Sequence, residues 1–354
     1  MKTLIKNARL AQKLKMREVA AAIQVDAALI SHWEKGSRKP TRQQLRKLAE
    51  VLSLDYRKLL IEWMSEVVLY EIKDEEWGMD ALKMVQDKMK LYRKSRIQTL
   101  DHGLQGILEE IDQLKFKLDE ARNIDSNRVK DALELEYTYE SNRIEGNTLS
   151  LRETDLVIRE GMTISGKSIR EHLEAINHQD AVAYLKELAQ KKTDIRERDI
   201  LQLHHLVLRG IDKAWAGKYR NVQVMIQGSQ HIPPQPYLVP VQMEQLMEWY
   251  EMNEQSLHPV VLAAEFSERL VSIHPFIDGN GRTSRLLMNL ILMRSGYVIA
   301  NIKGDHQNRM KYYEALDQCR DEGRKPVFHR FVAEVEKASL ERYLQIIQPQ
   351  VLGD

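Results

Sequence analysis

One polar loop in the sequence holds the side-chain types that phosphate chemistry requires. It reads His274-Pro275-Phe276-Ile277-Asp278-Gly279-Asn280-Gly281-Arg282-Thr283-Ser284-Arg285. His274 is the side chain in this loop that can act as a general base near neutral pH. Asp278 offers a hard oxygen ligand for Mg²⁺ or Mn²⁺, whose shell phosphate oxygens can complete. Gly279 and Gly281 let the backbone curl into a nest of amides around a phosphate.

Two helices must position this loop. Residues 264–273 before it and 286–293 after it have helical patterns, and the second run is strongly apolar. The loop therefore leads into a helix N-terminus, where backbone N–H groups and the helix dipole favour an anion. Arg282 and Arg285 lie in the first turn and would repel each other unless a polyphosphate bound there. The alternative is a glycine-rich turn whose arginines bind structural carboxylates, and it leaves His274 unexplained.

The loop resembles the motif of the Fic family of adenylyltransferases, His-x-Phe-x-(Asp/Glu)-Gly-Asn-Gly-Arg-x-x-Arg, without departure. The similarity extends over residues 130 to 340 or so. It implies transfer of AMP from ATP to a Ser, Thr or Tyr hydroxyl of a target protein, or of the chain itself, with release of pyrophosphate. Such a transfer depends on positioning and charge stabilisation more than on covalent chemistry.

The resemblance implies a role for each matching residue. His274 would deprotonate the target hydroxyl, and Asp278 would hold Mg²⁺ (or Mn²⁺) on the α- and β-phosphates. Arg282 would contact the β-phosphate and Arg285 the γ-phosphate. Further phosphate ligands would be Asn280 and the neighbouring backbone amides, including those of Gly279 and Gly281. Tyr312 and Tyr313 match the family's helix beside the adenine, although ordinary packing explains two tyrosines equally well.

A second feature interrupts the helical pattern. Residues 221–226 alternate apolar and polar before a turn, and a return arm follows that contains Pro233 and Pro234. This pattern predicts a small β-hairpin over 222–234, confined to an edge by its prolines. It resembles the Fic flap, which aligns a target segment by main-chain pairing, and Met225 and Ile226 would press on the modified residue. A hairpin that only fills a gap is the alternative.

A short motif upstream predicts self-inhibition. Ser141-Asn142-Arg143-Ile144-Glu145-Gly146-Asn147 ends a helix expected over residues 128–146. A carboxylate at that helix end costs about 0.3–1 kcal/mol unless a cation compensates it. Ser141 and Glu145 match the family's inhibitory Ser-x-x-x-Glu-Gly motif, which implies that Glu145 pairs with Arg285 and blocks the γ-phosphate. In some relatives the same Glu positions a water that removes AMP. A solvated terminal Glu is the alternative.

The first residues of the chain predict a DNA-binding unit. Residues 1–60 carry 14 Lys and Arg against 5 Asp and Glu, whereas the whole chain has a net charge of +1. A basic unit on an acidic body favours a nucleic-acid partner. Residues 14–36 resemble the Cro/repressor helix-turn-helix. The resemblance implies major-groove contacts for Ala27, Ala28 and His32, and phosphate contacts for Lys35 and Arg38. A protein-interaction module of the same fold is the alternative, and homodimers are frequent among such proteins.

These assignments predict a mainly α protein of 354 residues. The expected domains are a helix-turn-helix bundle (1–62), a helical connector (63–125) and an all-α Fic domain with a small flap (126–350), whose catalytic loop is 274–285. In the connector, Leu104, Leu108, Ile111, Lys115 and Leu118 roughly keep helical spacing without sustained heptads, which favours a helix packed on a neighbour.

The composition excludes other classes. With 43% hydrophobic and 30% charged residues, the chain is not wholly disordered. No apolar run approaches the roughly 18–20 residues of a membrane span, and the N-terminus lacks the apolar stretch of a signal peptide. Cys319 is the single cysteine, which excludes an internal disulfide and fits a cytoplasmic location.

The expected function is a self-inhibited protein adenylyltransferase with a DNA-binding domain. A DNA-binding transcription regulator whose Fic domain only senses nucleotide is the main alternative. The intact His274 argues against it, because a sensor needs phosphate ligands but no base. A phosphotransferase that binds the nucleotide in the reverse orientation is disfavoured by the intact Gly279-Asn280-Gly281, which relatives of that kind replace.

Overall fold

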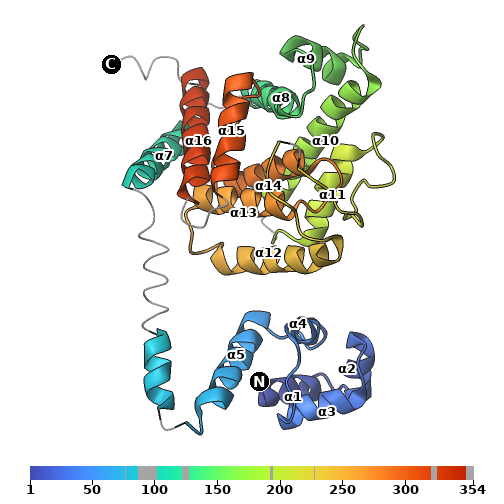
Figure 1. Ribbon diagram of the computed structural model, residues 1–354, viewed down its shortest axis with the longest axis vertical. Coiled ribbons are helices and arrows are strands. Elements are labelled where there is room, and N and C mark those ends of the chain that lie inside the picture. The colour runs from blue at the N-terminus through green and yellow to red at the C-terminus, as the bar shows by residue number, and fades with distance from the viewer. Residues whose placement is uncertain are drawn as a thin grey trace. The chain divides into compact units, whose positions relative to one another are not determined.

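The computed structural model describes residues 1–75, 77–86, 102–121, 127–191, 194–226, 228–319 and 325–347. Contacts within the chain divide it into two compact units, residues 1–97 and 98–354. Both units are built from helices (Figure 1), and the described residues hold no β-strand. This confirms the predicted mainly α class. No helix among these residues combines the length and apolarity that crossing a membrane requires.

The first unit is a helical bundle around one small core. Its helices include α1 (Lys2–Ala11), α2 (Met16–Ile23), α3 (Ala27–Lys35), α4 (Arg42–Val51) and α5 (Tyr56–Ile72). The core includes Ile5, Ile30, Trp33, Leu45 and Leu48, all almost entirely buried. Asp26 caps α3 by accepting a hydrogen bond from the N–H of Ala28, and Gly36 ends it in the left-handed conformation. These caps set the length of the helix predicted to meet DNA.

The second unit surrounds one mostly buried helix, α14 (Asn280–Arg294), near the middle of the unit in Figure 1. Its second half is apolar except for Asn289 and Arg294, and a helix with so few polar residues must be enclosed by others. The helices packed on it include α8 (Asn127–Ile144), α10 (Ile169–Lys191), α11 (Glu197–Leu208) and α13 (Pro259–Ile273). The unit also contains α7 (His102–Ala121), α9 (Leu151–Glu160), α12 (Val239–Asn253), α15 (His306–Gln318) and α16 (Pro326–Ile347).

The predicted connector does not extend to residue 125. Helix α7 packs along α16 and belongs to the second unit. Its apolar stripe, which the sequence analysis identified, is buried in the core of that unit at Leu104, Leu108, Ile111 and Leu118. The predicted and observed boundaries differ because four apolar side chains on one helical face must pack against another helix, which draws α7 into the second unit. The preference for a packed helix over a coiled coil is confirmed.

The hairpin predicted over 222–234 is wrong in its secondary structure, because the described residues of this segment form no paired strands. Side chains join the two arms instead. Arg220 Nη1 donates to the carbonyl of Val222 (3.0 Å), and its Nη2 donates to that of Pro234 (2.5 Å). Gln223 Nε2 donates to the carbonyl of Pro233 (2.8 Å). The two prolines have no N–H to donate to a ladder, which removes two of the backbone donors that a hairpin over this segment would use.

Candidate active site

The predicted loop joins two buried helices and is shaped by left-handed residues. Helix α13 ends at Ile273, and His274 has φ +50°, an uncommon value for a residue with a side chain. Gly279 has φ +79° and precedes the first turn of α14, which has no side-chain cap. The first N–H groups of α14 therefore lack partners within the helix. Together with the helix dipole, they form an anion site.

His274 is held as a neutral imidazole with one nitrogen available. Its Nδ1 lies 3.2 Å from the carbonyl oxygen of Val271. Because a carbonyl only accepts, Nδ1 carries the hydrogen, and Nε2 keeps its lone pair. Burial lowers the pKa of His274 to about 4. The ring is therefore uncharged near neutral pH and can accept a proton at Nε2.

Arg220, which the sequence analysis missed, fixes the backbone of the loop. This side chain is buried, and its Nε donates to the carbonyl of His274 (2.8 Å). Its own N–H donates to the carbonyl of Pro275 (2.9 Å). The same guanidinium also joins the two arms of segment 222–234. One residue thus couples the catalytic loop to the segment predicted to receive the target.

His204 is a second missed support of the loop. Its Nδ1 accepts a hydrogen bond from the N–H of Gly217 (3.0 Å), so its Nε2–H donates to the carbonyl of Asp278 (2.9 Å). The ring also stacks on Phe276, with 3.6 Å between centroids and 7° between planes. Burial lowers the pKa of His204 to about 4. The ring is therefore a neutral packing element of the loop.

Asn280 closes the loop on itself. Its Nδ2 donates to the carbonyl of Phe276 (2.9 Å), and its Oδ1 accepts from the N–H of the same residue (3.0 Å). The resemblance to the Fic motif implies that this side chain binds phosphate oxygens. In this structure each of its polar atoms satisfies one buried backbone group of Phe276, which leaves the second N–H of Nδ2 for a phosphate oxygen. Asn280 therefore contributes by holding the loop, and its N–H remains part of the anion site.

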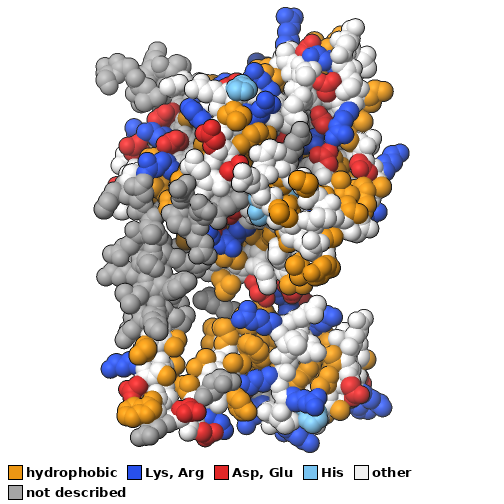
Figure 2. Space-filling view, in the orientation of Figure 1, with side chains coloured by type: hydrophobic (Ala, Val, Ile, Leu, Met, Phe, Trp, Pro, Cys, Tyr) orange, Lys and Arg blue, Asp and Glu red, His pale blue; other side chains and the backbone are white. Residues whose placement is uncertain are grey.

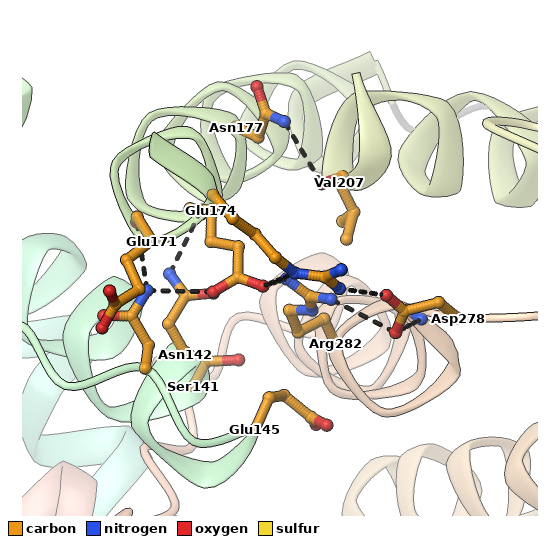
Figure 3. A network of polar contacts seen from close by, with 12 residues as sticks. Ser141, Asn142, Glu145, Glu171, Glu174, Asn177, Val207, Asp278 and Arg282 are labelled. Carbon is orange, nitrogen blue, oxygen red and sulfur yellow. Dashed lines mark hydrogen bonds and ion pairs between the residues drawn. The ribbon is translucent and has the colours of Figure 1, made fainter. Parts of the chain in front are cut away.

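The two arginines of the loop point to different carboxylates. Arg282 lies between Glu174 and Asp278 (Figure 3), with Nη1 3.3 Å and Nη2 3.5 Å from their oxygens. Arg285 donates through Nη2 to Glu145 Oε1 (2.7 Å). Both guanidiniums are almost fully buried. Arg282 Nε and Arg285 Nη1 lack hydrogen-bond partners within the described part of the chain, so each arginine keeps a donor for a further anion.

The carboxylate of Glu145 lies where an anion at the start of α14 would bind. A Cβ at position 281 would collide with Glu145 Oε1, so Gly281 is required for this close approach. Arg285 also donates through Nε to Ser141 Oγ (3.2 Å) and through Nη2 to the Ser141 carbonyl (2.9 Å). Burial lowers the pKa of Arg285, but the attraction of Glu145 outweighs it and raises that pKa. Both residues of the predicted inhibitory motif thus contact Arg285.

The tyrosines assigned to the nucleotide contact the same region. Tyr313 donates its hydroxyl to the carbonyl of Ile144 (3.2 Å), the last residue of α8. Burial and the charge of Glu145 raise the pKa of Tyr313 to about 12. The ring of Tyr312 is buried, with its centroid 5.8 Å from the Arg285 guanidinium. Tyr313 therefore contacts the end of α8, and Tyr312 packs beside Arg285 of α14.

Polar side chains tie the end of α8 to α10, and none of these ties was predicted. Asn142 Nδ2 donates to the carbonyl of Glu174 (3.2 Å), and Asn147 Nδ2 donates to Glu174 Oε2 (3.0 Å). The other oxygen of Glu174 faces Arg282. Glu174 thus contacts both the catalytic loop and the segment carrying Glu145 (Figure 3). Asn142 and Asn147 lie on either side of Glu145 in the inhibitory motif, and that position could have indicated them. No feature of the sequence indicated Glu174.

Asp278 is the carboxylate that could hold a divalent cation. Its Oδ1 accepts from the N–H of Gly279 (2.6 Å), and its side chain is 42% exposed. Burial raises its pKa, but Arg282, the Gly279 amide and Arg170 together lower it. Among the described residues, no three His, Cys, Asp or Glu gather as a metal centre. A single accessible carboxylate still fits Mg²⁺, which commonly uses one or two carboxylates with substrate phosphates and water.

A cavity of about 540 Å³ adjoins the loop. Its lining includes Ser272 and Ile273 just before His274, His231 and Pro234 from segment 222–234, and Lys325. In the same segment Met225 is 87% exposed and Ile226 is half-buried. Met225 is thus free to touch a partner. A larger cavity of about 660 Å³ lies among α8, α15 and α16, and no residue of the catalytic loop lines it.

Comparison with known proteins identifies the second unit. The family model described as Fic/DOC family matches residues 194–292, which include the whole loop described above. The chain contains a Fic domain. Glu145, Arg170 and Glu174 lie outside the matched residues of this Fic domain, although they contact its loop. A helix-turn-helix model matches residues 5–59 in the first unit.

Relatives with Fic domains are found among animal proteins. The chain is 39% identical to a protein adenylyltransferase Fic of Drosophila grimshawi over 249 residues, 70% of this chain and 50% of that protein. It is 38% identical to one of Nematostella vectensis, covering 57% of it. The chain thus spans about half the length of these relatives.

Solved Fic structures have a similar fold. Fic-1 of C. elegans (residues 134–508) superimposes with a TM-score of 0.61 at 28% identity, covering 94% of this chain and 97% of that one. A Fic domain containing signaling protein of Bacteroides thetaiotaomicron gives a TM-score of 0.63 at 28% identity, covering 69% and 99%.

The residues predicted to contact DNA are accessible in the first unit. Ala27, Ala28, His32, Lys35 and Arg38 are all exposed on α3 or just after it. On the face of the first unit that Figure 2 shows, Lys and Arg side chains are scattered among apolar and uncharged ones. A buried ion pair that the sequence analysis missed joins α1 to α3, since Arg9 donates to both oxygens of Glu34 (2.6 and 2.9 Å). This pair fixes the helix predicted to meet DNA.

Proposed function

We propose that the chain is a protein adenylyltransferase, which transfers AMP from ATP to a hydroxyl of a target protein or of itself. One observation carries the proposal: the neutral His274 lies at the start of the loop that ends in the uncapped α14 N-terminus with Arg282 and Arg285. A base beside a triphosphate site suits attack on a phosphorus atom. The names of the relatives support the same reaction.

In the proposed reaction the His274 Nε2 takes the proton of the target hydroxyl as its oxygen bonds to the α-phosphorus. The bond between that phosphorus and the bridging oxygen to the β-phosphate breaks, and pyrophosphate leaves. The amides of α14 and the guanidiniums of Arg282 and Arg285 would hold the phosphates and balance their charge. Asp278 would hold Mg²⁺ or Mn²⁺, which would supply further positive charge to the phosphates.

ATP carrying a radiolabel on different phosphates separates this proposal from its alternatives. Label from the α-phosphate on protein, with pyrophosphate released, supports adenylyl transfer. Label from the γ-phosphate supports phosphoryl transfer, and binding without label supports a nucleotide-sensing regulator. The Glu145→Gly variant should be included, because inhibition of the wild type would otherwise resemble sensing.

The rate should depend on pH through His274. Its pKa is lowered to about 4 from an ordinary value of 6.5, so the neutral base persists above about pH 5 and is lost as the pH falls through 4. We therefore expect a flat rate between about pH 5.5 and 8 in the Glu145→Gly variant, with an acid limb no higher than about 4, because the Glu145 charge that raises the pKa of His274 is removed. Initial rates of AMP labelling, with circular dichroism at each pH as the folding control, measure this. An acid limb near 6.5 would contradict it.

We propose that Glu145 inhibits the enzyme. Its carboxylate lies against the first turn of α14 and pairs with Arg285, so a triphosphate seated on the same groups must displace it. The Glu145 side chain is 31% exposed, and a carboxylate that water can reach could also direct a water to AMP on the target. Removal of AMP is thus a second candidate activity of the same residue.

We propose that segment 222–234 receives the target, with the exposed Met225 and the neighbouring Ile226 against the modified residue. The link from this segment through Arg220 to the His274 carbonyl supports the proposal. We further propose a cytoplasmic protein, consistent with one buried cysteine, Cys319, and a homodimer, as is usual for helix-turn-helix proteins that bind palindromic sites.

We propose that the first unit binds DNA through α3. Replacing Lys35 and Arg38 with alanine should remove two phosphate contacts and reduce the salt dependence of binding, with the slope of log K against log salt falling by about two. Fluorescence anisotropy with a duplex of random sequence measures this. Lys191→Ala in the second unit is the control, since Lys191 pairs with Glu187 (3.5 Å). An unchanged slope would exclude these contacts.

A further inference from the structure

The carboxylate of Asp278 already has a cationic partner from outside the loop. Arg170, in the first turn of α10, places its Nη2 2.5 Å from Asp278 Oδ2. The other oxygen, Oδ1, accepts from the Gly279 N–H (2.6 Å) and has Arg282 at 3.5 Å. Both oxygens are therefore engaged, and the side of Oδ2 that faces Arg170 is open to a divalent cation only after Arg170 leaves.

Of these partners, Arg170 is the exchangeable one. Its side chain is 57% exposed, whereas that of Arg282 is 2% exposed. The amide of Gly279 belongs to the backbone of the loop and cannot withdraw. Arg170 also has a second anchor, because its Nε donates to Glu174 Oε1 (3.2 Å) four residues further along α10. It can release Asp278 and remain paired with Glu174.

We propose that Arg170 is a built-in competitor of the divalent metal: its guanidinium occupies Asp278 until a metal–nucleotide complex displaces it. This inference rests on the proposed function, because it takes Asp278 as the metal ligand. Arg170 would then be a positioning residue that sets which metal complex can bind. A metal ion bound to nucleotide phosphates would replace the Arg170 guanidinium at Asp278, while Arg170 stays paired with Glu174. In the protein without nucleotide, Arg170 would thus weaken the binding of a metal ion to Asp278.

Removing the charge of Arg170 should tighten metal binding roughly fivefold. An exposed ion pair no longer has to be broken, and one positive charge near the metal disappears. Mn²⁺ is a suitable probe, because electron paramagnetic resonance counts the free ion without measuring activity. The titration uses the full chain with Glu145→Gly in every variant, saturated with α,β-methylene-ATP. Arg170→Met is expected to bind Mn²⁺ about fivefold more tightly, and Arg170→Lys, which keeps the charge, to stay within about twofold of the parent.

Two controls make the result specific. Arg159→Met removes another exposed arginine of the unit, paired with Asp155 at 2.7 Å, and should leave Mn²⁺ affinity unchanged. Asp278→Asn should abolish the site. Nucleotide affinity measured in EDTA reports any direct contact of Arg170 with phosphate, and we expect Arg170→Met to leave it within about twofold.

The outcomes separate this inference from the proposed function. Equal Mn²⁺ affinity in the parent and Arg170→Met, with loss in Asp278→Asn, overturns the competition while Asp278 remains the metal ligand. Weaker nucleotide binding by Arg170→Met in EDTA also overturns it, because Arg170 would then be a phosphate ligand. If Asp278→Asn binds Mn²⁺ as well as the parent does, the metal role of Asp278 fails and the inference fails with it.

Discussion

Replacing Glu145 with glycine is expected to raise the rate of AMP labelling about 10- to 100-fold over the wild type. The triphosphate must displace a charge-assisted hydrogen bond between Glu145 and the buried Arg285. Such a bond contributes about 1.5–3 kcal/mol, and each 1.4 kcal/mol corresponds to a tenfold change in population. Initial rates of incorporation from α-labelled ATP, at equal protein concentration, measure the effect.

Matched variants show whether the Glu145 carboxylate itself is responsible. Glu160→Gly removes an exposed glutamate from the end of α9 and should stay within about twofold of the wild type. Glu145→Gln keeps the size of the side chain but removes its charge, and should give an intermediate rate because the amide still accepts from Arg285. Equal labelling by wild type and Glu145→Gly would exclude self-inhibition by this residue.

Replacing His274 with alanine is expected to lower the labelling rate about 100- to 10,000-fold when both proteins carry Glu145→Gly. A positioned general base contributes a factor of this size. The Val271 carbonyl fixes the hydrogen on Nδ1, so Nε2 is the atom that the substitution removes from the reaction. Nucleotide affinity should change little, because the phosphates are assigned to α14 and its arginines.

A neighbouring histidine provides the control for this loss. His205 is exposed on α11, beside the buried His204 in the chain, and His205→Ala should keep the parent rate within about twofold. Circular dichroism and nucleotide binding establish that the His274 variant is folded. If that variant is folded, binds nucleotide and labels within tenfold of the parent rate, His274 is not the base.

The catalytic loop could be predicted because its chemistry is contiguous in the sequence. His274, Asp278 and the two arginines lie within twelve residues, and the apolar run after them indicates the buried helix. The pairing of Glu145 with Arg285 joins residues 140 positions apart. No spacing rule predicts it, and the expectation came from the resemblance to a family motif.

The supports of the loop could not be predicted, because tertiary packing alone brings them there. Arg220 and His204 contact carbonyl groups of the loop 54 and 74 residues away. The one local indication of such a support is a polar residue among buried apolar positions, as for His204 in α11. This indication does not predict which group the residue contacts. Arg170 lies 108 residues from Asp278.

In segment 222–234 the local sequence pattern predicted strands that the structure does not have. Alternating residues predict a strand only where backbone groups can pair. Pro233 and Pro234 remove two donors, and the side chains of Arg220 and Gln223 take over the joining of the two arms. Arg220 links this segment to the catalytic loop, but the predicted strands do not form in its described residues.

The intact mass of the Glu145→Gly protein after incubation with ATP and Mg²⁺ tests the central claim most directly. The claim is that His274 and the start of α14 direct attack at the α-phosphorus of ATP. A mass increase equal to one or more AMP groups, absent from the same protein with His274→Ala, is the predicted result. An increase of one phosphate, or an AMP adduct that persists without His274, would contradict it.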